Sequence, residues 1–249
     1  MNLAKKSGSL RVKRTTVPPF WQISKKKKRY VVRTSPGPHP KNYSYPMLVL
    51  LRDVLGVVKT RREALRVLNS GKVHVDGRAV RSESFPVGLM DVLDFPQLGK
   101  AYRLVPNRGR LTPVEIGAKE KDVKVCIVKS KNSVKGSKIG YGLHDGRVIF
   151  PEAKVDIKPG DACVLKVPGQ EFQKSFRLTK GGLALLIQGD RSGEVATVED
   201  VKQGTFSRGS IATVRLPDGT SSELPTSRLL PLGSQLPELT VSGFAVPAS

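Results

Sequence analysis

The sequence predicts an α+β fold of several domains. They are a basic extended arm at residues 1–44, a small helical-plus-hairpin module at 45–105, a central β-rich, barrel-like domain at 106–179, a C-terminal small β-barrel at 180–235 and a tail at 236–249. Three observations carry this prediction. Positive charge is concentrated at the front of the chain, helical signals occur only just after it, and the remainder alternates in short segments punctuated by Gly and Pro.

The first 44 residues carry twelve Lys or Arg and no Asp or Glu, within a chain of formal net charge +22. Such a segment cannot bury its charges, so we expect it to wrap a polyanion, most commonly a nucleic acid, with aromatic rings as stacking platforms. A solvated, disordered tail is the alternative. The contacts predicted in the arm are Arg11, Lys13, Arg14, Trp21, Lys25, Lys26, Lys27, Lys28, Arg29, Arg33 and His39.

The next segment reads as two helices and a hairpin. Residues 47–55 form an apolar helical stretch between a proline and Gly56. Thr60 and Glu63 have the spacing of a capping box that begins a second helix. Asp76-Gly77 suits the type I′ turn of a tight hairpin. This compact unit follows directly on the basic arm.

The cations of this module have an unusual placement. Lys59, Arg61 and Arg62 crowd a helix N-terminus, where the helix dipole attracts anions, so we expect a phosphate to share the site. The only nearby acid, Glu63, is used by the cap. An ordinary solvated helix face is the alternative. The contacts predicted here are Arg52, Lys59, Arg61, Arg62, Arg66, Lys72, Arg78 and Arg81.

The remainder is expected to be β-rich. Residues 108–167 alternate as half-buried strands do, and a Lys- and Gly-rich loop at 129–142 suits close approach to a phosphate chain, or is simply a flexible hairpin loop. Its predicted contacts are Lys131, Lys135 and Lys138. Cys126 and Cys163 stand alone inside apolar patterns, so we expect core residues rather than a metal site. No apolar run is long enough to cross a bilayer.

Several motifs occur in an order that resembles a known family. They are Ser35-Pro36-Gly37-Pro38-His39, Val75-Asp76-Gly77-Arg78, Pro86-x-Gly88-x-Met90-Asp91-Val92 and His144-Asp145-Gly146-Arg147. The stretch 45–105 resembles an S-four RNA-binding domain, and the whole chain resembles the archaeal and eukaryotic small-subunit ribosomal proteins called S-four-e. Residues 181–219 resemble a KOW motif of an SH3-like barrel, although Arg191 and Ala196 depart from its usual pattern.

The resemblance implies a structural constituent of the small ribosomal subunit in the cytoplasm, whose partners are small-subunit ribosomal RNA and neighbouring small-subunit ribosomal proteins. It implies no catalytic residue, metal, cofactor, small-molecule substrate or membrane. An S-four-domain pseudouridine synthase is disfavoured because Arg110-Leu111-Thr112 lacks the required Asp nucleophile. A non-ribosomal translation or elongation factor that combines both modules remains the alternative.

Overall fold

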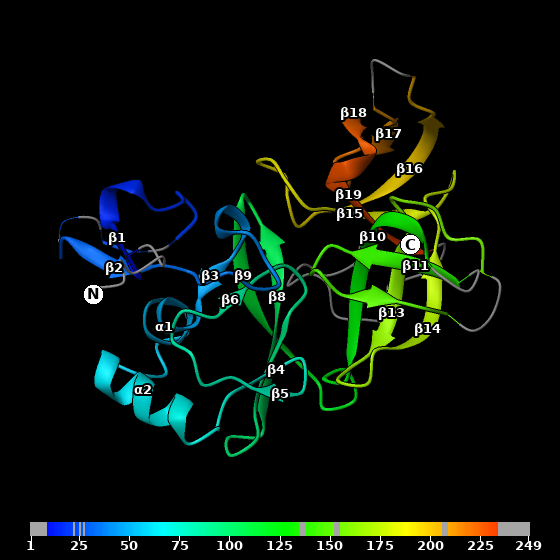
Figure 1. Ribbon diagram of the computed structural model, residues 1–249. Helices are drawn as coiled ribbons and strands as arrows, with labels where there is room; N and C mark the ends of the chain where they lie inside the picture. The colour runs from blue at the N-terminus through cyan, green and yellow to red at the C-terminus, as the bar shows by residue number, and fades with distance from the viewer. Residues whose placement is uncertain are drawn as a thin grey trace, which may run out of the picture.

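The computed structural model describes residues 9–21, 23, 24, 26, 28–134, 138–151, 155–205 and 209–233. Its main elements are three five-stranded antiparallel sheets, which follow one another along the chain (Figure 1). Helical segments in this part of the chain are few and short. The fold is therefore a mostly β structure of several units. None of the described helices is long and apolar enough to cross a membrane.

The arm is folded rather than extended. Strand β1 (Arg11–Lys13) pairs with β2 (Tyr30–Val32), and a short 3-10 turn at Arg14–Thr16 follows directly on β1. Its apolar side chains Val17, Trp21 and Val31 are buried in the core of the helical module. The arm thus has no separate core, and a few apolar residues are enough to dock this highly charged segment onto the neighbouring unit.

The helical module follows the predicted pattern with one difference. The predicted first helix begins as α1 (Met47–Val49) and continues as a π-helical turn, η3 (Leu50–Val54), before Gly56 at φ 67°. Helix α2 (Arg61–Asn69) begins with the predicted capping box. The Thr60 hydroxyl accepts from the Glu63 N–H at 3.2 Å, and the Glu63 carboxylate accepts from the Thr60 N–H at 3.3 Å. The short 3-10 turn η2 (Lys41–Tyr43) and the pair β3 (Tyr45–Pro46) and β6 (Pro86–Val87) join the arm to this module.

The first sheet has the strand order β5-β4-β7-β8-β9. Asp76 and Gly77 both have positive φ, at 49° and 74°, which confirms the type I′ turn between β4 and β5. The domain boundary expected after residue 105 falls inside β8, and the sheet continues through β9. The strands are β4 (His74–Val75), β5 (Arg78–Ala79), β7 (Val92–Phe95), β8 (Lys100–Asn107) and β9 (Arg110–Ile116).

The central sheet has the order β12-β11-β10-β13-β14. The loop expected at 129–142 is instead a long hairpin of β10 and β11, paired as far as Val134 and Lys138. Cys126 and Cys163 face one another across β10 and β13, both fully buried as expected. The strands are β10 (Val123–Val134), β11 (Lys138–Leu143), β12 (Val148–Ile149), β13 (Ala162–Lys166) and β14 (Glu171–Phe176).

The C-terminal sheet has the order β18-β17-β16-β15-β19, and side chains of β15 and β19 pack against β10 and β13 of the central sheet. Met90, Ile127 and Leu185 belong to one apolar cluster, so the first, central and C-terminal units share a core. Its elements are β15 (Leu183–Leu186), β16 (Val195–Lys202), β17 (Ile211–Arg215), β18 (Ser221–Pro225), the 3-10 turn η4 (Thr226–Arg228) and β19 (Leu229–Gly233).

Candidate nucleic-acid interface

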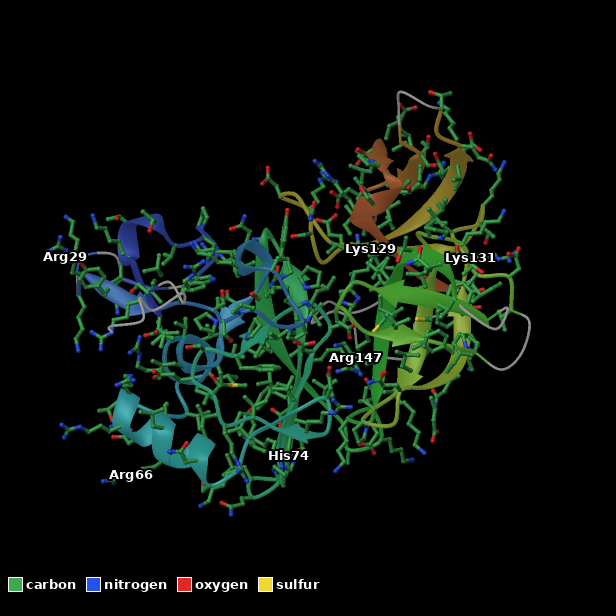
Figure 2. The ribbon with its side chains drawn as sticks, in the orientation of Figure 1. Arg29, Arg66, His74, Lys129, Lys131 and Arg147 are labelled. Carbon is green, nitrogen blue, oxygen red and sulfur yellow. The ribbon has the colours of Figure 1, made fainter. Side chains whose placement is uncertain are left out.

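Most of the predicted basic contacts project into solvent from the arm and the helical module. Figure 2 shows Arg29 and Arg66 at the same end of the molecule, on the β1–β2 hairpin and on α2. In the part of the chain that the structure describes, twelve predicted cations are exposed and make no ion pair with a carboxylate. They are Arg11, Lys13, Lys26, Lys28, Arg29, Arg33, Lys59, Arg62, Arg66, Lys72, Arg78 and Arg81.

Three predicted contacts are buried instead. Trp21 is 3% exposed and its indole N–H donates to the Ser44 carbonyl at 3.0 Å. Arg14 is 5% exposed and donates to the Ser24 carbonyl. His39 is equally buried, and its Nε2 lies 3.0 Å from an Asp91 oxygen. These side chains satisfy their polar groups inside the protein, so the expectation that they touch RNA is corrected.

Three further predicted cations each form an ion pair with an acidic side chain. Arg61 forms a two-bond pair with Glu83 at 2.7 and 2.6 Å. Arg52 lies 2.6 Å from Asp53. Lys131 lies 3.3 Å from Asp156. Glu83 follows Arg61 by 22 residues, so local spacing gave no sign of this pair. Lys25, Lys27 and Lys135 lie outside the described residues, and of Lys138 only the backbone, in β11, is described.

A buried charge cluster that sequence reasoning missed lies where the first sheet meets the central sheet. The Lys124 ammonium is fully buried and lies 2.7 Å from Asp76, 2.6 Å from Asp91 and 3.0 Å from Asp145. Arg147, labelled in Figure 2, also pairs with Asp76, at 2.5 Å. We call these five residues the Lys124 cluster.

The Lys124 cluster explains what several of the sequence motifs do in the fold, because each of them supplies one acidic side chain to it. Asp76 comes from the Val75–Arg78 turn, Asp91 from the Pro86–Val92 motif, and Asp145 from the turn after β11. His39, from the arm, reaches the same Asp91 carboxylate. These segments are far apart in the chain, so their shared role is to hold the arm and two sheets together.

Electrostatics keep the cluster ionised. Burial by itself would lower the pKa of Lys124, but the Asp91 and Asp76 carboxylates hold that pKa well above its usual value. Burial would raise the pKa of Asp91, and the Lys124 and His39 groups hold it below its usual value. The pKa of Asp145 is lowered in the same way. A buried ammonium and buried carboxylates thus stabilise one another's charged forms.

Cys126, His144 and Asp145 place ligand atoms within 4.8 Å of one another, but they are poorly suited to a metal ion. Burial raises the pKa of the Cys126 thiol well above its usual value, which opposes the thiolate that a metal needs. His144 accepts from the Ile127 N–H at 3.2 Å, and its Nε2 lies 3.2 Å from the Leu89 carbonyl. The Lys124 ammonium already balances Asp145. These groups are occupied by protein partners.

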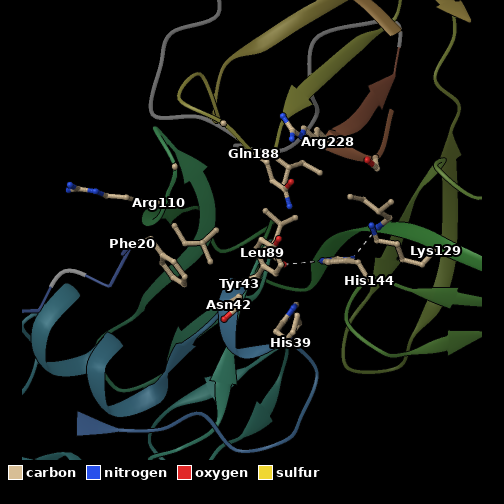
Figure 3. Close-up of a pocket in the computed structure, with 17 residues that line it drawn as sticks. Phe20, His39, Asn42, Tyr43, Leu89, Arg110, Lys129, His144, Gln188 and Arg228 are labelled. Atoms are coloured by element: carbon tan, nitrogen blue, oxygen red, sulfur yellow. Dashed lines mark hydrogen bonds between the residues drawn. The ribbon is translucent and has the colours of Figure 1, made fainter. Parts of the chain in front are cut away.

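A cleft of about 580 Å³ lies where the arm, the first sheet, the central sheet and the C-terminal sheet meet. In Figure 3, Phe20 and Arg110 lie on one side of it and His144 on the other, with Gln188 and Arg228 above. Sequence reasoning gave no sign of this cleft, because its walls come from segments that only the tertiary fold brings together.

Comparison with known proteins agrees with the resemblance found in the sequence. Family models match at residues 98–172 (Ribosomal family S4e), 6–42 (RS4NT domain) and 49–93 (S4 domain). Ribosomal family S4e is the S-four-e family that the sequence motifs resemble.

Similar full proteins extend the match to nearly the whole chain. "Small ribosomal subunit protein eS4" of Staphylothermus marinus is 32% identical over 94% of this chain and 96% of its own length. The protein of the same name from Desulfurococcus amylolyticus is 34% identical over 92% and 94%. The crystal structure of the 30S ribosomal protein S4e from Thermoplasma acidophilum superposes with a TM-score of 0.64 at 30% identity, covering 78% of this chain and 97% of that one. The order of motifs, the fold and this similarity together establish that the chain belongs to ribosomal protein family S4e.

Proposed function

We propose that this protein is a structural constituent of the small ribosomal subunit, which binds and scaffolds small-subunit ribosomal RNA in the cytoplasm. The observation that carries the proposal is the set of twelve exposed cations, free of carboxylate partners among the described residues, on the arm and the helical module. Relatives named small ribosomal subunit protein eS4 support the same assignment. Phosphate contacts position the protein, and RNA shape rather than a linear sequence is recognised.

The fold supports a preorganised interface. The β1–β2 hairpin shares one core with α2 through Val17, Trp21 and Val31, so cations on both elements keep fixed relative positions. Binding then orders less chain than a disordered arm would require, and the entropic cost of association falls. Affinity is expected to depend strongly on salt, because each neutralised phosphate releases counterions.

The C-terminal unit has a different role in this proposal. Residues 180–249 hold six basic and seven acidic residues. Arg191 lies 3.1 Å from Asp218, and Arg215 lies 2.8 Å from Glu199. Cations paired in this way have little charge left for phosphates. We propose that this sheet is the KOW-type, SH3-like unit suggested by the sequence and that it faces neighbouring ribosomal proteins.

A salt titration with two adjacent arginines tests the RNA contacts. Arg62 is exposed and makes no ion pair with the described carboxylates, whereas Arg61 already holds Glu83. Arg62→Ala is expected to reduce the slope of log affinity against log salt for ribosomal RNA by about 0.9 per lost phosphate contact. Arg61→Ala, the matched control, is expected to reduce it less. Equal slopes for the wild type and Arg62→Ala would mean that Arg62 faces only solvent.

Fractionation of native extract on sucrose gradients at low and high salt tests the assembly. We expect one copy per small subunit, retained through moderate salt. A substoichiometric protein that moves to the free fractions as salt rises would instead favour the alternative, a non-ribosomal RNA-binding translation or elongation factor.

A further inference from the structure

We infer that the cleft between the arm and the three sheets accepts a single unstacked nucleotide of the bound RNA. The inference rests on the proposed function and deepens it, because it names the form of RNA that one site takes. The volume of about 580 Å³ falls within the roughly 300–1,000 Å³ typical of pockets for small groups. An RNA double helix is too wide to enter such a space, whereas a single extruded nucleotide, with its base, sugar and phosphate, is a small group of the kind that such pockets hold.

The charge of the walls favours an anion. Among the described residues that line the cleft there is no Asp or Glu, whereas Arg110, Lys129 and Arg228 are present. All three are exposed, and none makes an ion pair with a carboxylate in the described part of the chain. They come from β9, β10 and η4, but in Figure 3 the Arg110 guanidinium points away from the other lining side chains, so Lys129 and Arg228 supply the positive charge at the cleft. A phosphate at the cleft mouth would meet cations whose charge is not already neutralised.

Aromatic side chains supply a surface for the base. Tyr43 is 56% exposed at the end of η2, although a ring of this size usually buries most of its area. Phe20 is partly buried and is held in place by an edge-on contact with Tyr45, with ring centroids 4.9 Å apart. Stacking on such rings is how proteins bind bases that have left a helix.

The remaining walls combine polar side chains with apolar ones such as Leu89, Leu111 and Ile187, and they are held in place. Asn42, Gln188 and Ser227 offer donors and acceptors that suit base edges and sugar hydroxyls. The Ile187 N–H donates to the Arg228 carbonyl at 2.9 Å, which joins two segments of the upper wall. His144, bonded to Leu89 and Ile127, fixes the side opposite Phe20. Stacking, charge and adaptable polar groups are therefore placed around one small space.

Binding of two probes by the full-length protein tests the inference. The probes are a short single-stranded oligouridylate and an RNA duplex of equal length, each fluorescently labelled. Tyr43→Ala should weaken binding of the single strand by about 5- to 150-fold, the range for loss of one base–aromatic stack, and leave duplex binding within about twofold. Tyr43→Phe should retain nearly all the affinity, because the stacking ring remains.

Tyr30→Ala is the matched control. Tyr30 is 46% exposed on β2, outside the cleft, beneath the Arg29 guanidinium at 5.3 Å. Both tyrosines are at the surface, so neither change should unfold the protein, and thermal melts verify this. A photoreactive 4-thiouridine oligonucleotide is expected to crosslink to the peptide that contains Tyr43, and to do so less in Arg228→Gln.

Three results of the binding and crosslinking experiments would overturn the inference. They are equal loss in Tyr30→Ala and Tyr43→Ala, unchanged single-strand affinity in Tyr43→Ala, or crosslinks confined to peptides outside the cleft. If Tyr43→Ala bound RNA normally but left the small subunit, the cleft would be a protein contact and the inference would also fail. Failure of the proposed function is distinct: wild-type protein would then show no salt-dependent affinity for any RNA and no association with small subunits.

Discussion

Replacing Lys124 with methionine tests whether the buried charge cluster holds the units together. The substitution keeps an unbranched side chain of similar length and removes the ammonium that lies within 3.0 Å of Asp76, Asp91 and Asp145. Arg147 still reaches Asp76, and His39 still reaches Asp91, but neither replaces a central charge bonded to all three carboxylates. Removing one partner of a buried ion pair costs about 3–5 kcal/mol, and we expect a loss of unfolding free energy at least this large.

The expected loss depends on pH in a definite direction. In the wild type the pKa values of Asp91 and Asp145 are lowered, so their contribution to stability is present above the unfolded value of about 3.9 and is lost as pH falls through the lower folded values. Without the ammonium, burial raises those pKa values instead. The destabilisation by Lys124→Met should therefore be largest near neutral pH and shrink as the carboxyls take up protons.

Urea unfolding followed by Trp21 fluorescence and by far-ultraviolet circular dichroism measures the effect. Trp21 is the single tryptophan and is buried in the first core. Lys166→Met is the control, since Lys166 is exposed on neighbouring β13 and lies 4.0 Å from Glu171, which is also exposed, a surface pair worth about 0–1 kcal/mol. Adding Asp91→Asn to Lys124→Met should restore part of the loss. Equal unfolding free energies for Lys124→Met and Lys166→Met would refute the reasoning.

Three further predictions concern packing and protonation. Gly193→Ala should lower the urea midpoint of unfolding, because a Cβ there would lie 2.3 Å from the Pro106 carbonyl oxygen and φ is 96°. Gly209→Ala is the control, because a Cβ at that position would have no atom within 4 Å. Equal midpoints for the two variants would contradict the tight contact between β8 and the C-terminal unit. Trp21→Ala should cost about 3–5 kcal/mol in thermal or urea unfolding, and a loss below about 0.5 kcal/mol would mean that the arm is not docked. His144 should titrate near pH 4 when followed by nuclear magnetic resonance, because burial and Lys124 lower its pKa to about 4. As pH drops from 6.5 towards 4, the imidazole takes up a proton in the unfolded chain but not yet in the folded protein, so the free energy of unfolding falls. A titration midpoint above about pH 6 would exclude this buried environment.

Local signals in the sequence were reliable where a few neighbouring residues decide the geometry. The spacing of Thr60 and Glu63 specified the start of α2, because the capping box closes within one turn. Asp76-Gly77 specified its hairpin turn, because both positions require positive φ. The ordered motifs also pointed to the correct family.

Long-range pairing decided what local patterns could not. In β10 the side chain of Lys124 lies on the opposite face from those of Val123 and Val125, and no local pattern shows that both faces of this strand are covered. Arg61 meets Glu83 only after the chain has folded back. The Lys-rich segment after Val128 was expected as a loop because its glycines suggest one, but hydrogen bonds with the partner strand keep it extended.

The sequence by itself determined the basic character of the arm and the helical module, the helix caps, the tight turns and the family. These properties depend on composition or on residues within a few positions of one another. Only the tertiary structure decided which of the cations remain free, that Trp21 and His39 are interior residues, and that four distant segments enclose a cleft. The physical reason is that burial and ion pairing depend on which surfaces meet, and contacts between residues far apart in the chain form only when the whole core assembles.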